Sequence, residues 1–147
     1  MSTYRSGKRV LIAVFVVLLV AGGAWASGKI EPTIPGLLVE TSWLESRLDH
    51  DNLVIIDTGR SVDDYNAGHI PGAVYLDRSD YYGEVGGIPG MFTGVDEVTD
   101  ALREAGVNDD SVVVVYDPGH GLWATRLFWT LELLGHVVVG GAQFEPL

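Results

Sequence analysis

Short apolar runs alternate with helical patterns along the chain. Two continuous runs, Leu53–Asp57 and Val112–Tyr116, have the length and the β-branched content of strands buried on both faces. Val74–Leu76 is a third and weaker candidate, and another β-branched run begins at His136–Val139. The pattern predicts four strands, with Val112–Tyr116 as the clearest of them.

The segments between these strands predict helices: Ser42–Leu48, Ser61–Gly68, Val95–Ala105 and Leu122–Leu134. Ser42 with Glu45 three residues later is a capping-box pattern, and Ser61 with Asp64 can cap the second helix. A glycine follows each of the last two helices, where a C-terminal cap is expected.

Residues 79–94 are rich in glycine and tyrosine and show no period, which predicts a long loop. Strands that alternate with helices predict an α/β fold, a doubly wound parallel sheet with helices on both faces. Such sheets bind ligands at the carboxyl ends of their strands. The loops after Asp57 and after Tyr116 are therefore the places to look for a site.

The first 26 residues differ from the rest. Arg5, Lys8 and Arg9 occur there without any acid, and an uncharged apolar run follows over residues 10–26 and ends in Ala24-Trp25-Ala26. This layout predicts a signal peptide or a membrane anchor rather than a buried helix. The run is shorter than the ~20 residues of a spanning helix, which favours cleavage. If it is not cleaved, residues 10–26 attach the chain to a membrane.

Either outcome predicts an exported protein, periplasmic or extracellular. Residues 27–36 contain two prolines and two glycines and predict an extended linker, so we expect the folded domain over residues 37–147. A chain of 147 residues with 47% hydrophobic and 20% charged residues fits one globular domain.

Charge and cysteine content exclude several classes of protein. The formal net charge is −11, so no nucleic-acid partner is expected, since phosphate binding needs a basic face. The absence of cysteine removes disulfide scaffolds, thiolate zinc sites and every thiol nucleophile. His50, His120 and His136 are scattered along the sequence, so neither a metal site nor a cofactor is expected.

The loop after Val112–Tyr116 is the strongest candidate for a site. It consists of Asp117, Pro118, Gly119, His120 and Gly121, and it leads into a helix that carries Arg126. Glycines between a strand and a helix N-terminus leave backbone N–H groups free to bind an anion.

Three interpretations of this loop remain open. Gly119 and Gly121 with Ala124 nearly match a dinucleotide-binding fingerprint, although the match is to a short pattern. Asp117 could instead be a nucleophile of an enzyme with an aspartyl-phosphate intermediate. In the third interpretation, Asp117 and the glycines form a cap and a turn without a ligand.

Several segments resemble the rhodanese family: Asp57, Gly68-His69-Ile70-Pro71-Gly72-Ala73, the run Val112–Asp117 and the Leu-Leu-Gly-His at 133–136. The chain resembles most closely the N-terminal half of two-domain thiosulfate or 3-mercaptopyruvate sulfurtransferases, from about Leu37 to His136. The resemblance implies a five-stranded doubly wound parallel sheet.

In active rhodanese domains a cysteine begins the loop that follows this strand. Its thiolate takes a sulfane sulfur from the donor, and backbone N–H groups and a basic residue stabilise the persulfide. Asp117 stands at that position here, as is common in the N-terminal halves of the family, which are non-catalytic and pack against the active half. A carboxylate cannot carry a transferable sulfur, so this chain alone is expected to be inactive.

The resemblance also implies roles for residues outside the loop. Asp57 and His69, with Gly68, Pro71 and Gly72, belong to a structural turn and hydrogen-bond network in the family. Single-domain members more often have the arginine two residues after the aspartate, whereas Arg60 follows Asp57 by three. Arg126 is expected to pair with Asp117 or to face the partner domain.

The family continues after His136 through a strand to a helix, whereas this sequence ends at Leu147. We therefore expect the last helices of the domain to be missing and one sheet face to be exposed. The sequence as a whole predicts the rhodanese-like domain of an exported sulfurtransferase, with a second rhodanese domain as partner. The alternative is a stand-alone binding or regulatory module that docks a protein or binds a small sulfur-containing anion at residues 117–121.

Overall fold

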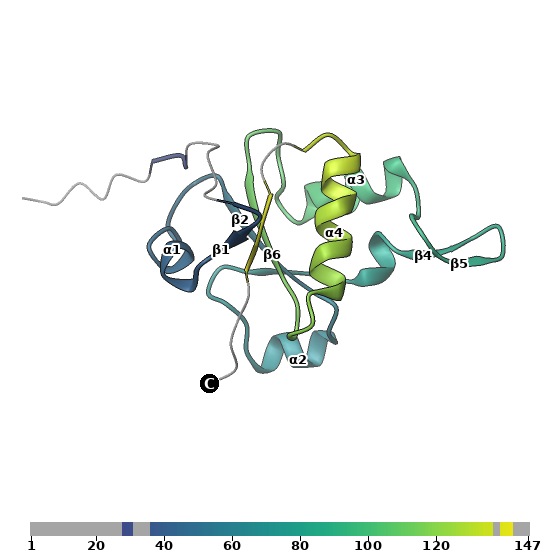
Figure 1. Cartoon of the computed structure of the whole chain (residues 1–147), viewed down its shortest axis with the longest axis horizontal. Coiled ribbons are helices and arrows are strands. Elements are labelled where there is room, and N and C mark those ends of the chain that lie inside the picture. Colours follow the sequence, from purple (N-terminus) through teal and green to yellow (C-terminus); the bar gives the residue numbers. More distant parts are fainter. Residues whose placement is uncertain (1–27, 31–35, 137–138, 143–147) are drawn as a thin grey trace, which may run out of the picture.

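The computed structural model describes residues 28–30, 36–136 and 139–142. Five strands form one sheet in the order β1-β7-β6-β2-β3, and each neighbouring pair is parallel. The strands are β1 (Leu38–Val39), β2 (Leu53–Thr58), β3 (Val74–Leu76), β6 (Val112–Tyr116) and β7 (Val139–Ala142). The predicted α/β fold with a parallel sheet is confirmed (Figure 1).

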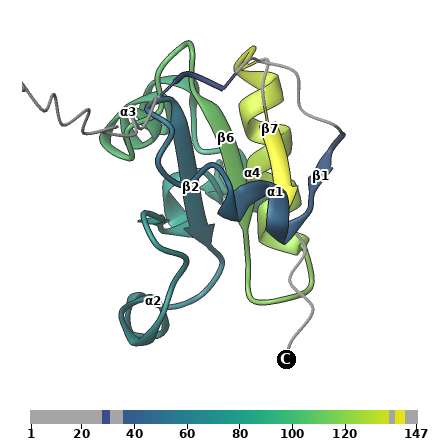
Figure 2. The same cartoon turned by 90° about the vertical axis from the view of Figure 1, so that its left-hand side faces the viewer.

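Helices cover both faces of this sheet. They are α1 (Thr41–Glu45), α2 (Val62–Ala67), α3 (Val95–Glu104) and α4 (Leu122–Leu133), and a 3-10 turn, η1, spans Arg78–Asp80. Figure 2 shows α4 behind the strands and α1 in front of them. The doubly wound arrangement places the carboxyl ends of β2 and β6 at one edge, where the candidate loops begin.

The alternation of side chains along β2 and β6 creates two separate cores. Ile56 and Val113 face α3 and α4 and pack in one cluster with Leu127. Ile55 and Val114 face the other way and pack with residues of α1 and of the loop before β3. Val114 is 0% exposed and Ile55 is 3% exposed. The central strands β2 and β6 are thus buried on both faces, whereas Leu38 of the edge strand β1 is 57% exposed. The expectation of an exposed sheet face does not hold for these central strands, and for the rest of the sheet it stays a prediction.

Two predicted helix starts have different outcomes. Ser61 caps α2 as expected: its Oγ accepts from the backbone N–H of Asp64 at 3.2 Å and donates to the Asp64 carboxylate at 2.7 Å. The capping box at Ser42 is wrong, because the carbonyl of Glu40 accepts from the backbone N–H groups of Trp43 and Leu44. Helix α1 therefore begins at Thr41, and Ser42 lies inside its first turn.

The prediction of a long loop over residues 79–94 is also wrong. This segment contains an antiparallel hairpin of β4 (Gly83–Val85) and β5 (Ile88–Met91), which projects from the body of the domain (Figure 1). Gly86 and Gly87 form its two-residue turn with φ of 62° and 81°, the conformation of a type I′ turn.

The segment expected to be a linker contacts the domain where the structure describes it. Ile30 N–H donates to Oδ1 of Asn52 at 2.7 Å, and the Asn52 amide donates back to the Ile30 carbonyl at 3.1 Å. The predicted leader, residues 1–26, and most of the linker lie outside the described residues. Within the described ranges no helix is long and apolar enough to cross a membrane.

Candidate functional site

The loop over residues 117–121 connects the carboxyl end of β6 to the N-terminus of α4. Gly121 precedes the first helical residue and has φ of 67°, a left-handed conformation that glycine adopts without a steric penalty. Because Gly121 has no side chain, it cannot cap the helix with one. The first N–H groups of α4 must therefore find their acceptor elsewhere.

The acceptor is the carboxylate of Asp117. Its Oδ1 accepts from the backbone N–H groups of Gly119 and Gly121, each at 3.0 Å. Its Oδ2 accepts from the N–H groups of Trp123 at 2.9 Å and Ala124 at 3.2 Å. The ring of backbone donors that could hold an anion is thus filled by a carboxylate from the same loop.

The electrostatics of the loop favour this internal anion. Partial burial raises the pKa of Asp117, but the four backbone N–H donors outweigh burial and lower the pKa below its ordinary value. The positive end of the α4 dipole also stabilises a negative charge there. An external anion would meet donors already in use and a like charge.

This geometry bears on the three interpretations of the loop. A nucleotide phosphate would need the N–H groups of Gly119 and Gly121, which Asp117 already binds. A phosphorylated aspartate needs metal ligands nearby, and the described residues include no group of three acidic or histidine side chains that could hold a metal. The arrangement matches the third interpretation, a cap and a turn.

Arg126 and His120 lie outside the ring of donors. The Arg126 guanidinium lies 4.8 Å from the ring centre of Tyr82. Among the described contacts no hydrogen bond or ion pair joins Arg126 to Asp117, so the expected pairing is not found. The reason is that both Asp117 oxygens already accept from the backbone. His120 is exposed to solvent.

Trp123, in the first turn of α4, makes contacts that no sequence pattern predicted. Arg78 lies 5.0 Å from the centre of its ring and Tyr82 meets it edge-on at 5.2 Å. Gly59 lies so close that an added Cβ would meet the indole at 2.3 Å. The signal in the sequence was Gly59 directly after a predicted strand. The spacing of residues could not show that Trp123 would lie against it.

A second network surrounds Asp57, which is 0% exposed. Arg60 Nε donates to both of its oxygens, at 2.9 and 3.0 Å, and the Tyr116 hydroxyl donates to Oδ2 at 2.5 Å. Arg60 also donates to the Gly68 carbonyl at 2.7 Å, and Ile70 N–H donates to the Tyr116 hydroxyl at 3.2 Å. These hydrogen bonds connect the carboxyl ends of β2 and β6 to the segment that begins at Gly68.

Burial, followed by the bond to Asp57, raises the pKa of Tyr116 to about 12, so its hydroxyl keeps its proton at neutral pH. The hydrogen bond to Asp57 raises the pKa of Arg60. Arg60 therefore forms an ion pair with Asp57, although it follows the aspartate by three residues rather than two. The positive charge of its guanidinium balances the negative charge of the buried carboxylate.

The turn that carries His69, Pro71 and Gly72 is held by Tyr65. The His69 ring stacks on the Tyr65 ring at 4.0 Å, and its Nδ1 lies 2.9 Å from the Tyr65 carbonyl. The Tyr65 hydroxyl donates to the carbonyl of Ala73 at 2.7 Å. Gly72 has φ of 79° in this turn. These contacts fix the turn at the carboxyl ends of β2 and β6.

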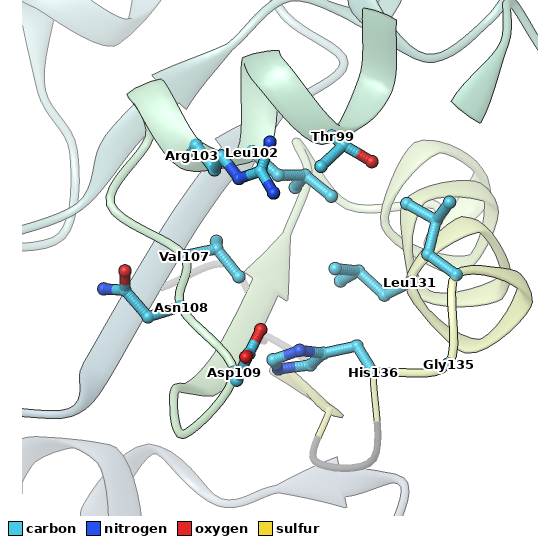
Figure 3. A pocket seen from close by; sticks show the side chains of 10 residues that line it. Thr99, Leu102, Arg103, Val107, Asn108, Asp109, Leu131, Gly135 and His136 are labelled. Carbon is cyan, nitrogen blue, oxygen red and sulfur yellow. The ribbon is translucent and has the colours of Figure 1, made fainter. Parts of the chain in front are cut away.

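A hollow of about 250 Å³ lies at the opposite end of β6, between the C-terminal ends of α3 and α4 (Figure 3). His136 lines it and lies with Nε2 3.0 Å from the Ser111 carbonyl. Arg103, also in the lining, is 3.5 Å from the Asp100 carboxylate. Because the hollow lies at the other end of β6 and none of residues 117–121 lines it, it is separate from the site at that loop.

The chain is similar in sequence to a known protein family and to several curated proteins. The rhodanese-like domain family matches residues 40–142. The 3-mercaptopyruvate sulfurtransferase of Escherichia coli K12 is 34% identical over 106 residues, which is 66% of this chain and 38% of that protein. The thiosulfate sulfurtransferase of Azotobacter vinelandii is 32% identical over 120 residues, 76% of this chain and 44% of that protein.

The crystal structure of SseA, a 3-mercaptopyruvate sulfotransferase of Escherichia coli, has a similar fold. It superposes with a TM-score of 0.65 at 32% identity, covering 72% of this chain and 44% of that one. The chain thus spans about two fifths of the length of the curated relatives it matches.

Proposed function

Because the chain belongs to the rhodanese-like domain family, we propose that it is the non-catalytic rhodanese domain of an exported thiosulfate or 3-mercaptopyruvate sulfurtransferase. Its partner is a second rhodanese domain that carries the nucleophilic cysteine. That domain takes a sulfane sulfur and passes it to a thiophile such as cyanide. The present chain contributes scaffold and interdomain surface.

The observation that carries the proposal is the position of the Asp117 carboxylate. The resemblance to the family puts Asp117 at the position of the cysteine of an active member, and four backbone N–H groups bind its carboxylate. A thiolate forms a persulfide because sulfur is polarisable, whereas a carboxylate oxygen forms no comparable bond to sulfane sulfur. The 147 residues contain no cysteine that could substitute for it.

Two further observations support the wider proposal. Two of the curated relatives are sulfurtransferases, and each is more than twice as long as the matched segment, which leaves room in them for a second domain. Export is supported by the basic residues and the apolar run before Ser27.

The test of the loop is to restore the nucleophile with Asp117→Cys. After incubation with thiosulfate or 3-mercaptopyruvate, we expect the mass of the folded variant to increase by one sulfur atom. The matched control is Asn66→Cys, which puts a thiol on an exposed position of α2. The original chain and the control should gain no sulfur. A folded Asp117→Cys chain that also gains none would contradict a rhodanese-type loop here.

The proposed pairing with a second rhodanese domain needs a separate test, because a stand-alone protein could also have a loop of the rhodanese type. We expect the coding DNA that flanks these 147 codons to specify, in one of its frames, a rhodanese domain with a cysteine after its central strand. Assayed alone, the chain should transfer no sulfur from thiosulfate to cyanide. If no such domain is encoded nearby, the stand-alone binding module becomes the better account.

A further inference from the structure

Residues 28–30, which we call the strap, are bound to the domain. Ile30 is 8% exposed, and its backbone N–H and carbonyl both pair with the side chain of Asn52, at 2.7 and 3.1 Å. Asn52 is itself 7% exposed, and its amide also donates to the Asp110 carbonyl at 3.1 Å. The Asn52 side chain thus binds Ile30 as a neighbouring strand would, through one donor and one acceptor.

The two residues before Ile30 add further contacts. His50 Nδ1 donates to the carbonyl of Gly28, and Lys29 forms an ion pair with Asp110. The ion pair is exposed to solvent, so it contributes little to stability. The hydrogen bonds of Ile30 are buried, and breaking them would leave buried polar groups without partners. The strap is therefore held mainly at Ile30.

The partners of the strap all lie at one edge of the sheet. His50 and Asn52 come just before β2 and Asp110 comes just before β6, whereas the loop over residues 117–121 follows β6. In Figure 2 the strap lies near the upper ends of these strands and the loop lies at their lower ends. At about 3.3 Å per residue, the positions from 110 to 117 separate the two edges by about 20 Å.

The strap also comes almost directly after the predicted leader. Only Ser27 separates Ala26, the last residue of the apolar run, from Gly28 in the sequence. Two residues of chain span at most about 7 Å. A membrane that holds residues 10–26 therefore lies close to the edge of the domain that binds the strap.

We propose that the strap orients the domain on a membrane while the leader is attached. The amino ends of β2 and β6 then face the lipid headgroups, and the loop over residues 117–121 faces away from them, where a second domain can reach it. Without the strap, residues 27–36 would be one continuous connection, and no edge of the domain would be held at the membrane. The proposal rests on the export part of the proposed function and not on its sulfur chemistry.

Hydrogen exchange of the full chain in nonionic detergent tests the strap itself. By NMR, the N–H of Ile30 should exchange about tenfold or more slowly than that of Lys29, after correction for their intrinsic rates. Ile30 N–H donates to Asn52, whereas the described contacts give the N–H of Lys29 no acceptor. Equal rates would overturn the proposal before any membrane is involved.

The orientation is measured in vesicles of phosphatidylcholine, whose headgroups carry no net charge and so do not repel the acidic domain. The chain has no cysteine, so Asp109→Cys and His120→Cys each place a single fluorophore, at exposed positions before and after β6. A quencher attached to the headgroups should quench the label at residue 109 about threefold or more strongly than the label at residue 120, since about 20 Å separates the two edges.

Two insertions of equal length are the matched controls. A Gly-Ser insertion of about 12 residues after Ser27 spans roughly 20 Å and separates the leader from the strap, so the two labels should then be quenched equally. The same insertion after Thr33, between the strap and β1, keeps the strap next to the leader and should preserve the difference. If the strap is not bound, both insertions only lengthen one connection, and equal effects of the two would overturn the proposal.

Two results with the chain that has no insertion would overturn the proposal as well. The first is quenching that is equal at the two labels or stronger at residue 120. The second is a chain that does not bind the vesicles. Slow exchange at Ile30 would then show that the leader prediction is at fault rather than the strap, and sulfur loading of Asp117→Cys would test the rhodanese-type loop separately.

Discussion

The carboxylate of Asp117 accepts a hydrogen bond from the backbone N–H of Trp123, six residues later, at 2.9 Å. One side chain thus replaces the N-terminal cap that Gly121 cannot supply. The same bond holds Trp123 against Gly59, which follows β2. The loop over residues 117–121 thus connects β2, β6 and α4 structurally.

Asp117→Ala should destabilise the domain by about 2 kcal/mol. The substitution removes a helix cap and leaves partly buried N–H groups without an acceptor. Urea unfolding at neutral pH measures the change. Asp63→Ala, at an exposed acid in the first turn of α2, is the control and should change stability by less than about 0.5 kcal/mol. Equal losses in the two variants would show that the cap contributes little.

The stability of the domain should also depend on pH through Asp117. Its folded-state pKa lies below the ordinary 3.8, so the native state favours the charged form. The contribution is therefore complete above a pH of about 5 and is lost as the pH falls through 3.8 and below. Urea unfolding as a function of pH should give a smaller acid-induced loss for Asp117→Asn than for the original chain. Parallel curves would contradict the lowered pKa.

Tyr116→Phe should cost about 1–3 kcal/mol, because its hydroxyl donates to buried Asp57 and accepts from Ile70 N–H. Tyr82→Phe is the matched control, since the described contacts give the Tyr82 hydroxyl no hydrogen bond. Thermal unfolding of both variants tests the difference. If Tyr82→Phe costs as much, the loss reflects altered ring packing rather than the network at Asp57.

Gly59→Ala should be more destabilising than Gly72→Ala. Both glycines have positive φ, of 83° and 79°, so alanine pays about 1 kcal/mol of backbone strain at either position. At Gly59 the new methyl group also collides with the Trp123 indole, whereas at Gly72 it has no described neighbour within 4 Å. The excess in urea unfolding should shrink when Trp123 is replaced by alanine, and an unchanged excess would place the strain elsewhere.

The sheet could be predicted from sequence because each of its central strands is a short, continuous run of apolar residues. Val112–Tyr116 is apolar throughout, which suits a strand with a helix on each face. Strand β1 has two residues and pairs with β7 from the other end of the chain, so no local pattern identifies it. The hairpin had a signal in Gly86-Gly87, but Pro89 inside one strand argues against pairing, and only an edge strand tolerates it.

The sequence was sufficient to locate the candidate site at residues 117–121. It was not sufficient to predict which group the backbone N–H donors of this loop bind. The glycines after β6 indicated backbone donors at a helix N-terminus, and they are there. Which group they bind depends on where the Asp117 side chain turns, which no spacing rule decides. The contact of Trp123 with Gly59 joins the first turn of α4 to the residue after β2, 64 positions apart in sequence, and it depends on β2 and β6 being neighbours in the sheet.

The four hydrogen bonds of Asp117 also set the cost of placing a different acceptor at this position. A thiolate is a larger and softer acceptor than a carboxylate oxygen, and it cannot divide four N–H groups between two atoms. A cysteine at residue 117 is therefore expected to lower the folding stability of the domain, since the start of α4 depends on both carboxylate oxygens. In this domain a thiol at the loop and a well-capped helix are competing requirements.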